Sequence, residues 1–388
     1  MERRIYLDNS ATTPLCDAAK RSIESMLDVY GNPSSLHSLG SEAEAQIKTA
    51  REQILLALGV RAREGELVFT SCGTEATALA FFGCAHAKER RDATRILIGE
   101  GEHPSVKNSA QALEREGFEV VQIPTRGGAL DMTALESALD KKIFMASFML
   151  VNNETGALYS VGEAFGKIKQ RYPDAITHCD AVQGFMKIPF TPAALKADLV
   201  SVSGHKLHAP KGVGALYVSA EMIKKRKIVP YLYGGGQEKG LRSGTENTLG
   251  ICAFGAAVAD IRPRLPKIRA QLEELYLYAR QKIEALGIQV NVPTGARASH
   301  IINVTLPSIK SETALHFLSA EGIFVSSGSA CSSHSGKPSE TLIAFGLSPF
   351  EADCSLRISL SEYNTKEDVD ALIASLSMAL DRLVRIKR

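Results

Sequence analysis

The sequence predicts an α/β protein with two domains: a larger one built on a mostly parallel sheet covered by helices, and a smaller α+β one. Three observations support this prediction. From residue 66 to 219, short runs rich in β-branched and aromatic residues alternate with helical runs, which is typical of a parallel sheet with helices on both faces. A long amphipathic stretch follows near residue 263. Beyond it comes a shorter series of strands and helices.

The larger domain, residues 15–255, is expected to contain seven strands. The expected strands are 66–71, 95–103, 119–125, 142–154, 175–183, 197–204 and 212–219, with helices at 74–90, 105–117, 132–140 and 161–173 between the first five. Ligands of such sheets bind at the carboxyl ends of the strands. The polar residues that end these strands therefore form the candidate site.

The smaller domain is expected to combine residues 1–14 with residues 256–388. Residues 263–287 read as a long helix with Leu272, Leu275, Leu277 and Ile283 available for one buried face. The expected elements after it are a strand at 300–308, a helix at 311–322, a strand at 323–328 and a final helix at 365–385.

Composition limits the classes of function. The 388 residues are 45% hydrophobic and 23% charged, which is enough for two cores. A net charge of +2 gives no electrostatic reason to bind nucleic acid or a membrane surface, and no apolar run is long enough to span a bilayer. The beginning of the sequence lacks the apolar core of a signal peptide. Seven cysteines without a CxxC pair predict no metal site and a reducing, cytoplasmic location.

Polar residues end successive predicted strands. In "TSCGTEA", the backbone N–H groups of Gly73 and Thr74 and the Thr74 hydroxyl could cradle a phosphate at a helix start, although a plain N-cap is the alternative. The other strand ends supply His103, Asn153, Asp180, Gln183, Ser203, His205 and Lys206. Taken singly, Lys206 reads as a surface charge and His103 as an ordinary polar residue.

Taken together, these residues suit an aldehyde cofactor. Lys206, with Ser203 and His205 beside it, could hold an aldehyde as a Schiff base next to phosphate donors. Asp180 could keep a pyridine nitrogen protonated, and His103 could stack on the ring and move protons. This is the electron-sink arrangement that pyridoxal 5′-phosphate (PLP) requires. The competing phosphate motif, GxxxxGK[ST], is absent from the sequence.

One cysteine stands in an unusual setting. Cys331 lies in "FVSSGSACSSHSG", among serines and glycines, whereas a structural cysteine is normally a small buried hydrophobe. Either the thiol is an accident on a flexible loop, or the loop serves to carry the sulfur.

The sequence resembles class V aminotransferase-fold enzymes and, within them, cysteine desulfurases of the NifS/IscS kind. The matching segments run in family order from residue 6 to 360: "YLDNSATTP", "GNPSSLH", "FTSCGTEA", "GEHPSV", "VNNETGA", "CDAVQ", "SGHKLHAPKGVGALYV", "GGGQEKGLRSGTEN", "SSGSACSS" and "SLRISL". The conjunction of "SGHK" with "SSGSAC" is the most specific part. The resemblance implies the PLP-dependent transferase fold of type I.

The resemblance also implies a role for each residue. Lys206 would bind PLP covalently, Asp180 would pair with its ring nitrogen, and His103 would stack on the ring as acid and base. Gln183 and Asn153 would contact the ring-oxygen side, and Thr74, Ser203 and His205 the phosphate. Thr245 would reach the phosphate of the partner subunit in a homodimer. Arg357 would clamp the substrate carboxylate bidentately, and Cys331 would be the nucleophile.

The implied reaction converts L-cysteine to L-alanine and leaves a persulfide on Cys331. A mobile loop suits a thiol that visits the cofactor and then an acceptor. The acceptor would be an iron–sulfur scaffold or a tRNA-modifying protein, and Cys331 could contact an iron–sulfur cluster during transfer. The chain ends at Arg388 without the tail that IscS-type enzymes use to dock their scaffold. This difference counts against an iron–sulfur scaffold as the partner.

Two motifs depart from the family pattern. Thr77-Ala78, in "TEATA", replaces a frequent Asp-Asn pair, and Glu362, in "SLSEY", replaces a frequent arginine near the expected clamp. Three other functions stay open: a selenocysteine lyase, a class V aminotransferase or lyase that uses Lys206 without Cys331, and a sulfur-binding partner that keeps the fold without turnover.

Overall fold

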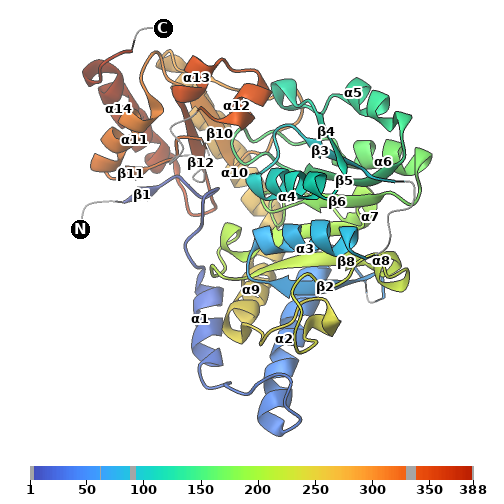
Figure 1. The fold of residues 1–388 in the computed structure, drawn as a ribbon. Helices are drawn as coiled ribbons and strands as arrows, with labels where there is room; N and C mark the ends of the chain where they lie inside the picture. The colour runs from blue at the N-terminus through green and yellow to red at the C-terminus, as the bar shows by residue number, and fades with distance from the viewer. Residues whose placement is uncertain (1–3, 62, 88–92, 329–337, 387–388) are drawn as a thin grey trace.

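The computed structural model describes residues 4–61, 63–87, 93–328 and 338–386. It confirms the predicted fold class. Figure 1 shows a large α/β unit beside a smaller layered unit, with both ends of the described chain on the smaller one.

The larger unit is built on a seven-stranded sheet. Its strands, in spatial order, are β2 (Gly65–Thr70), β8 (Gly214–Ser219), β7 (Leu199–Ser203), β6 (Ile176–Asp180), β5 (Ile143–Met149), β3 (Arg95–Gly99) and β4 (Glu119–Ile123). The strands from β7 to β4 are parallel, and β8 is antiparallel to both of its neighbours. The carboxyl ends of the parallel strands therefore meet along one edge.

Helices cover both faces of this sheet. The helices are α3 (Gly73–Ala85), α4 (Pro104–Arg115), α5 (Met132–Ser137), α6 (Val161–Arg171), α7 (Pro192–Leu195) and α8 (Ala220–Lys224). Side chains alternate between the faces along each strand. In β3, Ile96 and Ile98 pack in the apolar cluster under α3 and α4, while Leu97 packs in the other cluster, which includes Phe165 of α6. Burial on both faces explains why β3 reads as a continuous apolar run.

The smaller unit carries two sheets and five helices within the described residues. Strands β12 (Ser355–Ser359), β10 (Ile301–Thr305) and β9 (Gln289–Val290) form an antiparallel sheet, and β1 (Ile5–Tyr6) pairs in parallel with β11 (Ile323–Phe324). The helices are α10 (Leu265–Ala285), α11 (Ser311–Ala320), α12 (Glu340–Phe345), α13 (Pro349–Asp353) and α14 (Lys366–Arg382).

The predicted apolar face of α10 was wrong at one position. Leu272, Leu275 and Ile283 are buried as expected, but Leu277 is 51% exposed. Each helical residue turns by about 100°, so Leu277 points almost opposite to Leu275. Tyr276 is buried instead.

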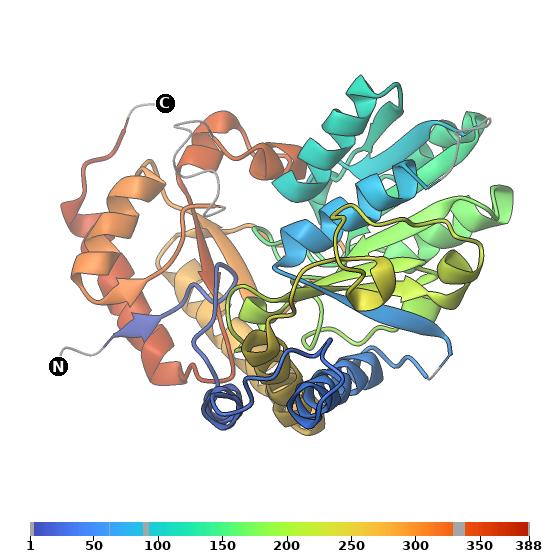
Figure 2. The same ribbon diagram turned by 60° about the horizontal axis from the view of Figure 1, so that its bottom comes forward.

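Three further helices pack against one another. Helix α9 (Thr248–Ile261) packs against α1 (Asp17–Met26) and α2 (Ser38–Ala57), and this group lies along the bottom of the view in Figure 2. Helix α9 runs without interruption through residue 255, and the division at that residue stays a prediction. Among the described residues, no helix combines the length and the apolar character that crossing a membrane requires.

Candidate active site

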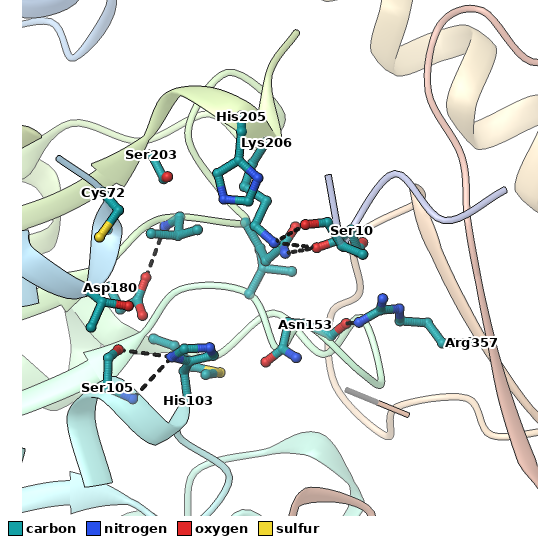
Figure 3. Close-up of a pocket in the computed structure, with 17 residues that line it drawn as sticks. Ser10, Cys72, His103, Ser105, Asn153, Asp180, Ser203, His205, Lys206 and Arg357 are labelled. Carbon is teal, nitrogen blue, oxygen red and sulfur yellow. Dashed lines mark hydrogen bonds between the residues drawn. The ribbon is translucent and has the colours of Figure 1, made fainter. Parts of the chain in front are cut away.

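A cavity of about 240 Å³ lies at the carboxyl ends of the parallel strands, where β12 of the smaller unit approaches them. Figure 3 shows the side chains that converge on it. Ten predicted site residues line it: Gly73, Thr74, His103, Asn153, Asp180, Gln183, Ser203, His205, Lys206 and Arg357. Residues separated by almost 300 positions in the sequence thus share one pocket.

Lys206 lies at the end of a 3₁₀ turn, Gly204–Lys206, that directly follows β7. Its Nζ donates to the main-chain carbonyls of Ser10, at 2.6 Å, and Ala11, at 2.8 Å. The backbone of Thr13 donates to the His205 carbonyl at 2.9 Å, which fixes the N-terminal segment against this turn. The lysine nitrogen is therefore held inside the pocket.

Asp180 supplies a buried carboxyl group to the pocket. Asp180 ends β6, is 6% exposed and accepts a hydrogen bond from the Val182 N–H at 2.9 Å. Burial raises the pKa of this carboxyl, while His103 and Lys206 oppose the rise. A cation beside Asp180 would therefore be stabilised strongly, since the carboxylate has little contact with water.

His103 is the N-cap of α4. Its Nδ1 accepts from the Ser105 backbone N–H at 3.1 Å and lies 2.9 Å from the Ser105 hydroxyl. Burial lowers the pKa of His103 below its usual value, so the ring is neutral near pH 7. Because Nδ1 accepts the Ser105 N–H, the neutral ring carries its proton on Nε2.

The start of α3 has the features of a phosphate cradle. The N-cap residue, Cys72, makes no side-chain capping bond, which leaves the first N–H groups of the helix available. The hydroxyl of Ser203 is buried and has no hydrogen-bond partner in the described part of the chain. A Cβ on Gly73 would lie 2.9 Å from Val182 Cγ2, closer than carbon atoms pack. This position thus requires glycine, beside an orphaned hydroxyl that an anion would satisfy.

His205 and Gln183 complete the lining near the N-terminal segment. The Nδ1 of His205 lies 3.2 Å from the Thr12 hydroxyl, and burial lowers the pKa of His205 to about 4. Gln183 donates from Nε2 to the Ser10 carbonyl at 2.9 Å and accepts from Lys187 Nζ at 3.4 Å. Gln183 is therefore fixed from both sides.

Arg357 stands in the middle of β12 and is 1% exposed. Its Nη1 donates to the Asn153 carbonyl at 3.0 Å, and its Nη2 donates to Asp8 Oδ1 at 2.7 Å. The Nε is buried without a hydrogen-bond partner among the described residues. A buried guanidinium with an unsatisfied N–H in a pocket wall is suited to bind a carboxylate.

Two predicted residues do not join this pocket. Thr245 is exposed and is not part of the lining. Cys331 lies outside the described residues, between Gly328 and Pro338.

The positions at which the two motifs depart from the family pattern are not part of the lining. Thr77 is fully buried in α3, with an unpartnered hydroxyl among the described residues. Glu362 lies 3.2 Å from His208 Nε2 and lines a separate cavity of about 20 Å³, not the one that Arg357 lines. Glu362 was expected to lie near Arg357, but it does not line the pocket that Arg357 lines.

Several residues of the site were missed by the sequence prediction. Ser10 and Ala11 act through main-chain carbonyls, so their side chains gave no signal. Ser105 follows the "HP" of an N-cap motif, which could have identified it as a partner of His103. Asp8 could not be assigned without knowing that β12 runs beside the N-terminal segment.

Comparison with known proteins identifies the family. The model of the aminotransferase class-V family matches residues 5–372. A cysteine desulfurase of Trichormus azollae is 38% identical, with 98% of this chain and 93% of the relative covered. A solved NifS-like protein has a TM-score of 0.90 at 33% identity, covering 98% of this chain and all (100%) of that one. A solved structure of SspA in complex with cysteine has a TM-score of 0.78 at 31% identity, covering 94% and 100%. The chain therefore belongs to the class-V aminotransferase family and, within it, to the cysteine desulfurases of the NifS/IscS type.

Proposed function

We propose that this protein is a PLP-dependent cysteine desulfurase that converts L-cysteine to L-alanine and carries the sulfur as a persulfide on Cys331. The observation that carries the proposal is the meeting of Lys206, Asp180 and Arg357 in one pocket. The first two suit an aldehyde cofactor with a pyridine nitrogen, and the third suits a carboxylate.

The residues present fit PLP. Lys206 would hold the aldehyde carbon, and Asp180 would hold a proton on the ring nitrogen. Gln183 and Asn153 would face the ring oxygen, while the Ser203 hydroxyl, Thr74, His205 and the start of α3 would hold the phosphate. When bound, PLP acts as an electron sink for negative charge that develops on the substrate carbons.

The substrate is held at two points. Arg357 binds the α-carboxylate, and its Nε–H, which has no hydrogen-bond partner among the described residues, is available for this. Lys206 would take a proton from the substrate α-carbon, and the carbonyls of Ser10 and Ala11 hold its nitrogen when it is protonated. His103 donates a proton from Nε2 and takes it back during turnover.

Cys331 supplies the sulfur nucleophile. Its thiolate attacks the sulfur of the bound cysteine, a new S–S bond forms, and the bond between that sulfur and Cβ breaks. The electron pair of the broken bond stays on the carbon skeleton, which then takes protons and leaves as L-alanine. The thiol of one cysteine thus becomes the outer sulfur of the Cys331 persulfide, and no external oxidant is needed.

We also propose that the enzyme is a homodimer in which Thr245 reaches the cofactor phosphate of the partner subunit. Thr245 is exposed and away from its own pocket. Tyr231 and Tyr233, on the preceding segment, are 48% and 75% exposed. Large aromatic side chains that are exposed together mark an interaction surface.

The proposal includes a sulfur-acceptor protein, either an iron–sulfur scaffold or a tRNA-modifying enzyme, and a cytoplasmic location. Support for the location comes from the six described cysteines, which are all free thiols. Fractionation of cells would test it, and transfer of labelled sulfur to each class of acceptor would distinguish the partners.

The function is tested by incubation of the PLP-loaded protein with L-cysteine and a reductant, with alanine and sulfide measured together. We expect equal amounts of both products and none from the Lys206→Ala variant. Strong preference for L-selenocysteine would support a selenocysteine lyase instead. Conversion of cysteine to a keto acid without alanine would support an aminotransferase.

A further inference from the structure

Asp8 contacts the substrate side of the pocket but has no role in the function proposed above. Its Oδ1 accepts a hydrogen bond from Arg357 Nη2 at 2.7 Å, and this is also an ion pair. The Arg357 side chain is 2% exposed and that of Asp8 is 18% exposed. A guanidinium this deeply buried requires a nearby negative charge, because an unpaired buried charge is costly.

The backbone around Asp8 is held on both sides. Leu7 donates its N–H to the Phe324 carbonyl at 2.8 Å, and the Ser359 N–H donates to the Leu7 carbonyl at 2.7 Å. The Tyr6 hydroxyl donates to the Asp8 carbonyl at 3.0 Å. Asp8 therefore projects from a segment fixed between β11 and β12, so its carboxylate has a defined position relative to Arg357.

We propose that Asp8 is a positioning residue that determines specificity: it orients Arg357 so that the guanidinium presents one fixed edge to the α-carboxylate of an amino-acid substrate. The proposal rests on the function proposed for Arg357. The guanidinium is a planar fork whose N–H directions are fixed relative to one another. With Nη2 bonded to Asp8 and Nη1 bonded to the Asn153 carbonyl, the orientation of the whole plane is determined.

The same segment also sets the distance between the two substrate contacts. Two and three residues after Asp8, the carbonyls of Ser10 and Ala11 hold Lys206 Nζ. In an α-amino acid, the carboxylate that Arg357 binds and the proton that Lys206 removes are attached to one carbon, so the two side chains must keep a short and constant separation. A rigid connection from Arg357 through Asp8 to Lys206 provides it.

If the proposal is right, loss of the Asp8 charge weakens the binding of ligands that carry a carboxylate. It leaves the binding of ligands without a carboxylate almost unchanged. In the Asp8→Asn variant, Arg357 loses its charged partner and turns toward other acceptors, so bidentate binding is lost. The dissociation constants of L-cysteine and L-alanine should rise about tenfold or more. Binding of cysteamine, which has the amine and the thiol but no carboxylate, should change less than about twofold.

The experiment uses PLP-loaded protein in the Cys331→Ala background, where sulfur transfer is stopped, and follows the cofactor absorption during titration with each ligand. Asp140→Asn is the matched control. Asp140 also pairs with a buried arginine, Arg95, but this pair lies at the start of β3, and the pocket lies at the carboxyl ends of the strands. Asp8→Glu keeps the charge and should recover part of the affinity for L-cysteine.

Three results would overturn the inference. The first is unchanged binding of L-cysteine by Asp8→Asn. The second is tighter binding of L-cysteine, which would make Asp8 a competitor of the substrate carboxylate. The third is an equal loss of affinity for cysteamine, which would make the role of Asp8 structural. Failure of the proposed function is a separate result: the parent protein would then show no cofactor absorption, or no response to any of the ligands.

Discussion

The ammonium group of Lys206 donates a hydrogen bond to the main-chain carbonyl of Ser10 across 2.6 Å. The two residues are brought together because the segment that runs from β1 to α1 (Figure 1) is hydrogen-bonded to the turn after β7, where the Thr13 N–H donates to the His205 carbonyl. The nitrogen of Lys206 therefore has a defined place in the pocket that Asp180 and Arg357 also line. This contact links the proposed cofactor site to the proposed carboxylate site.

Lys206→Ala should abolish covalent attachment of PLP. The wild-type protein should be yellow, with an absorption band from the bound aldehyde, and the variant should lose or shift that band because alanine has no nitrogen to form the bond. The measurement is an absorption spectrum after reconstitution with PLP and removal of the excess. A colourless wild type that cannot be reconstituted would contradict the cofactor assignment.

His103→Gln should reduce kcat by about 10²–10⁴-fold and leave the cofactor bound, because the loss is that of a proton carrier. In the wild type, kcat should fall as pH decreases through the lowered pKa of His103, since protonation places a hydrogen on Nδ1, against the Ser105 N–H. His86→Gln, at an exposed histidine that pairs with Glu116, is the control. Turnover at the wild-type rate by a PLP-loaded His103→Gln protein would exclude this role.

Thr245→Ala should weaken retention of PLP without lowering the melting temperature, because Thr245 is exposed. The rate of PLP loss during dialysis measures the effect, and analytical ultracentrifugation measures the oligomeric state. Thr133→Ala, at an exposed threonine of α5, should retain PLP like the wild type. A fully active monomer would disprove the shared site.

Lys187 should make stability depend on pH. It is partly exposed, and desolvation lowers its pKa to about 7, against about 10.4 in an unfolded chain. Between these values the unfolded state binds more protons, so the free energy of unfolding rises with pH across this window. Below about pH 7 the folded protein holds a charged, desolvated Lys187, and the destabilisation is fully present. Lys187→Met should remove this destabilisation, which is on the order of a few kcal/mol.

The readout is the difference in unfolding free energy between Lys187→Met and the wild type. This difference should favour the variant near pH 6 and shrink toward pH 10. Lys167→Met should not show the trend, because Glu136 raises the pKa of Lys167 instead of lowering it. A difference that does not vary with pH would mean that Lys187 keeps an ordinary pKa.

The sheet and most of the pocket could be predicted from the sequence because they depend on local patterns. Strands buried on both faces read as apolar runs, and their polar ends identify the site by a rule of parallel sheets. Arg357 was predicted from its motif, but its pairing with Asp8 depends on two segments that are far apart in the chain. Ser10 acts through its main-chain carbonyl, so its side chain did not reveal it. Leu277 was assigned to the buried face because it is apolar, although its spacing from Leu275 places it on another face of the helix.

The central claim is that Cys331 takes sulfur from cysteine, and a single-turnover reaction tests it most directly. PLP-loaded wild-type protein is mixed with one equivalent of L-cysteine without reductant. Alanine is then quantified, and the peptide that contains Cys331 is analysed by mass spectrometry. The account predicts one alanine for each added sulfur atom on Cys331, while the Cys331→Ala variant shows the spectral change of substrate binding but forms neither product. Alanine and sulfide formed by Cys331→Ala at the wild-type rate would contradict it.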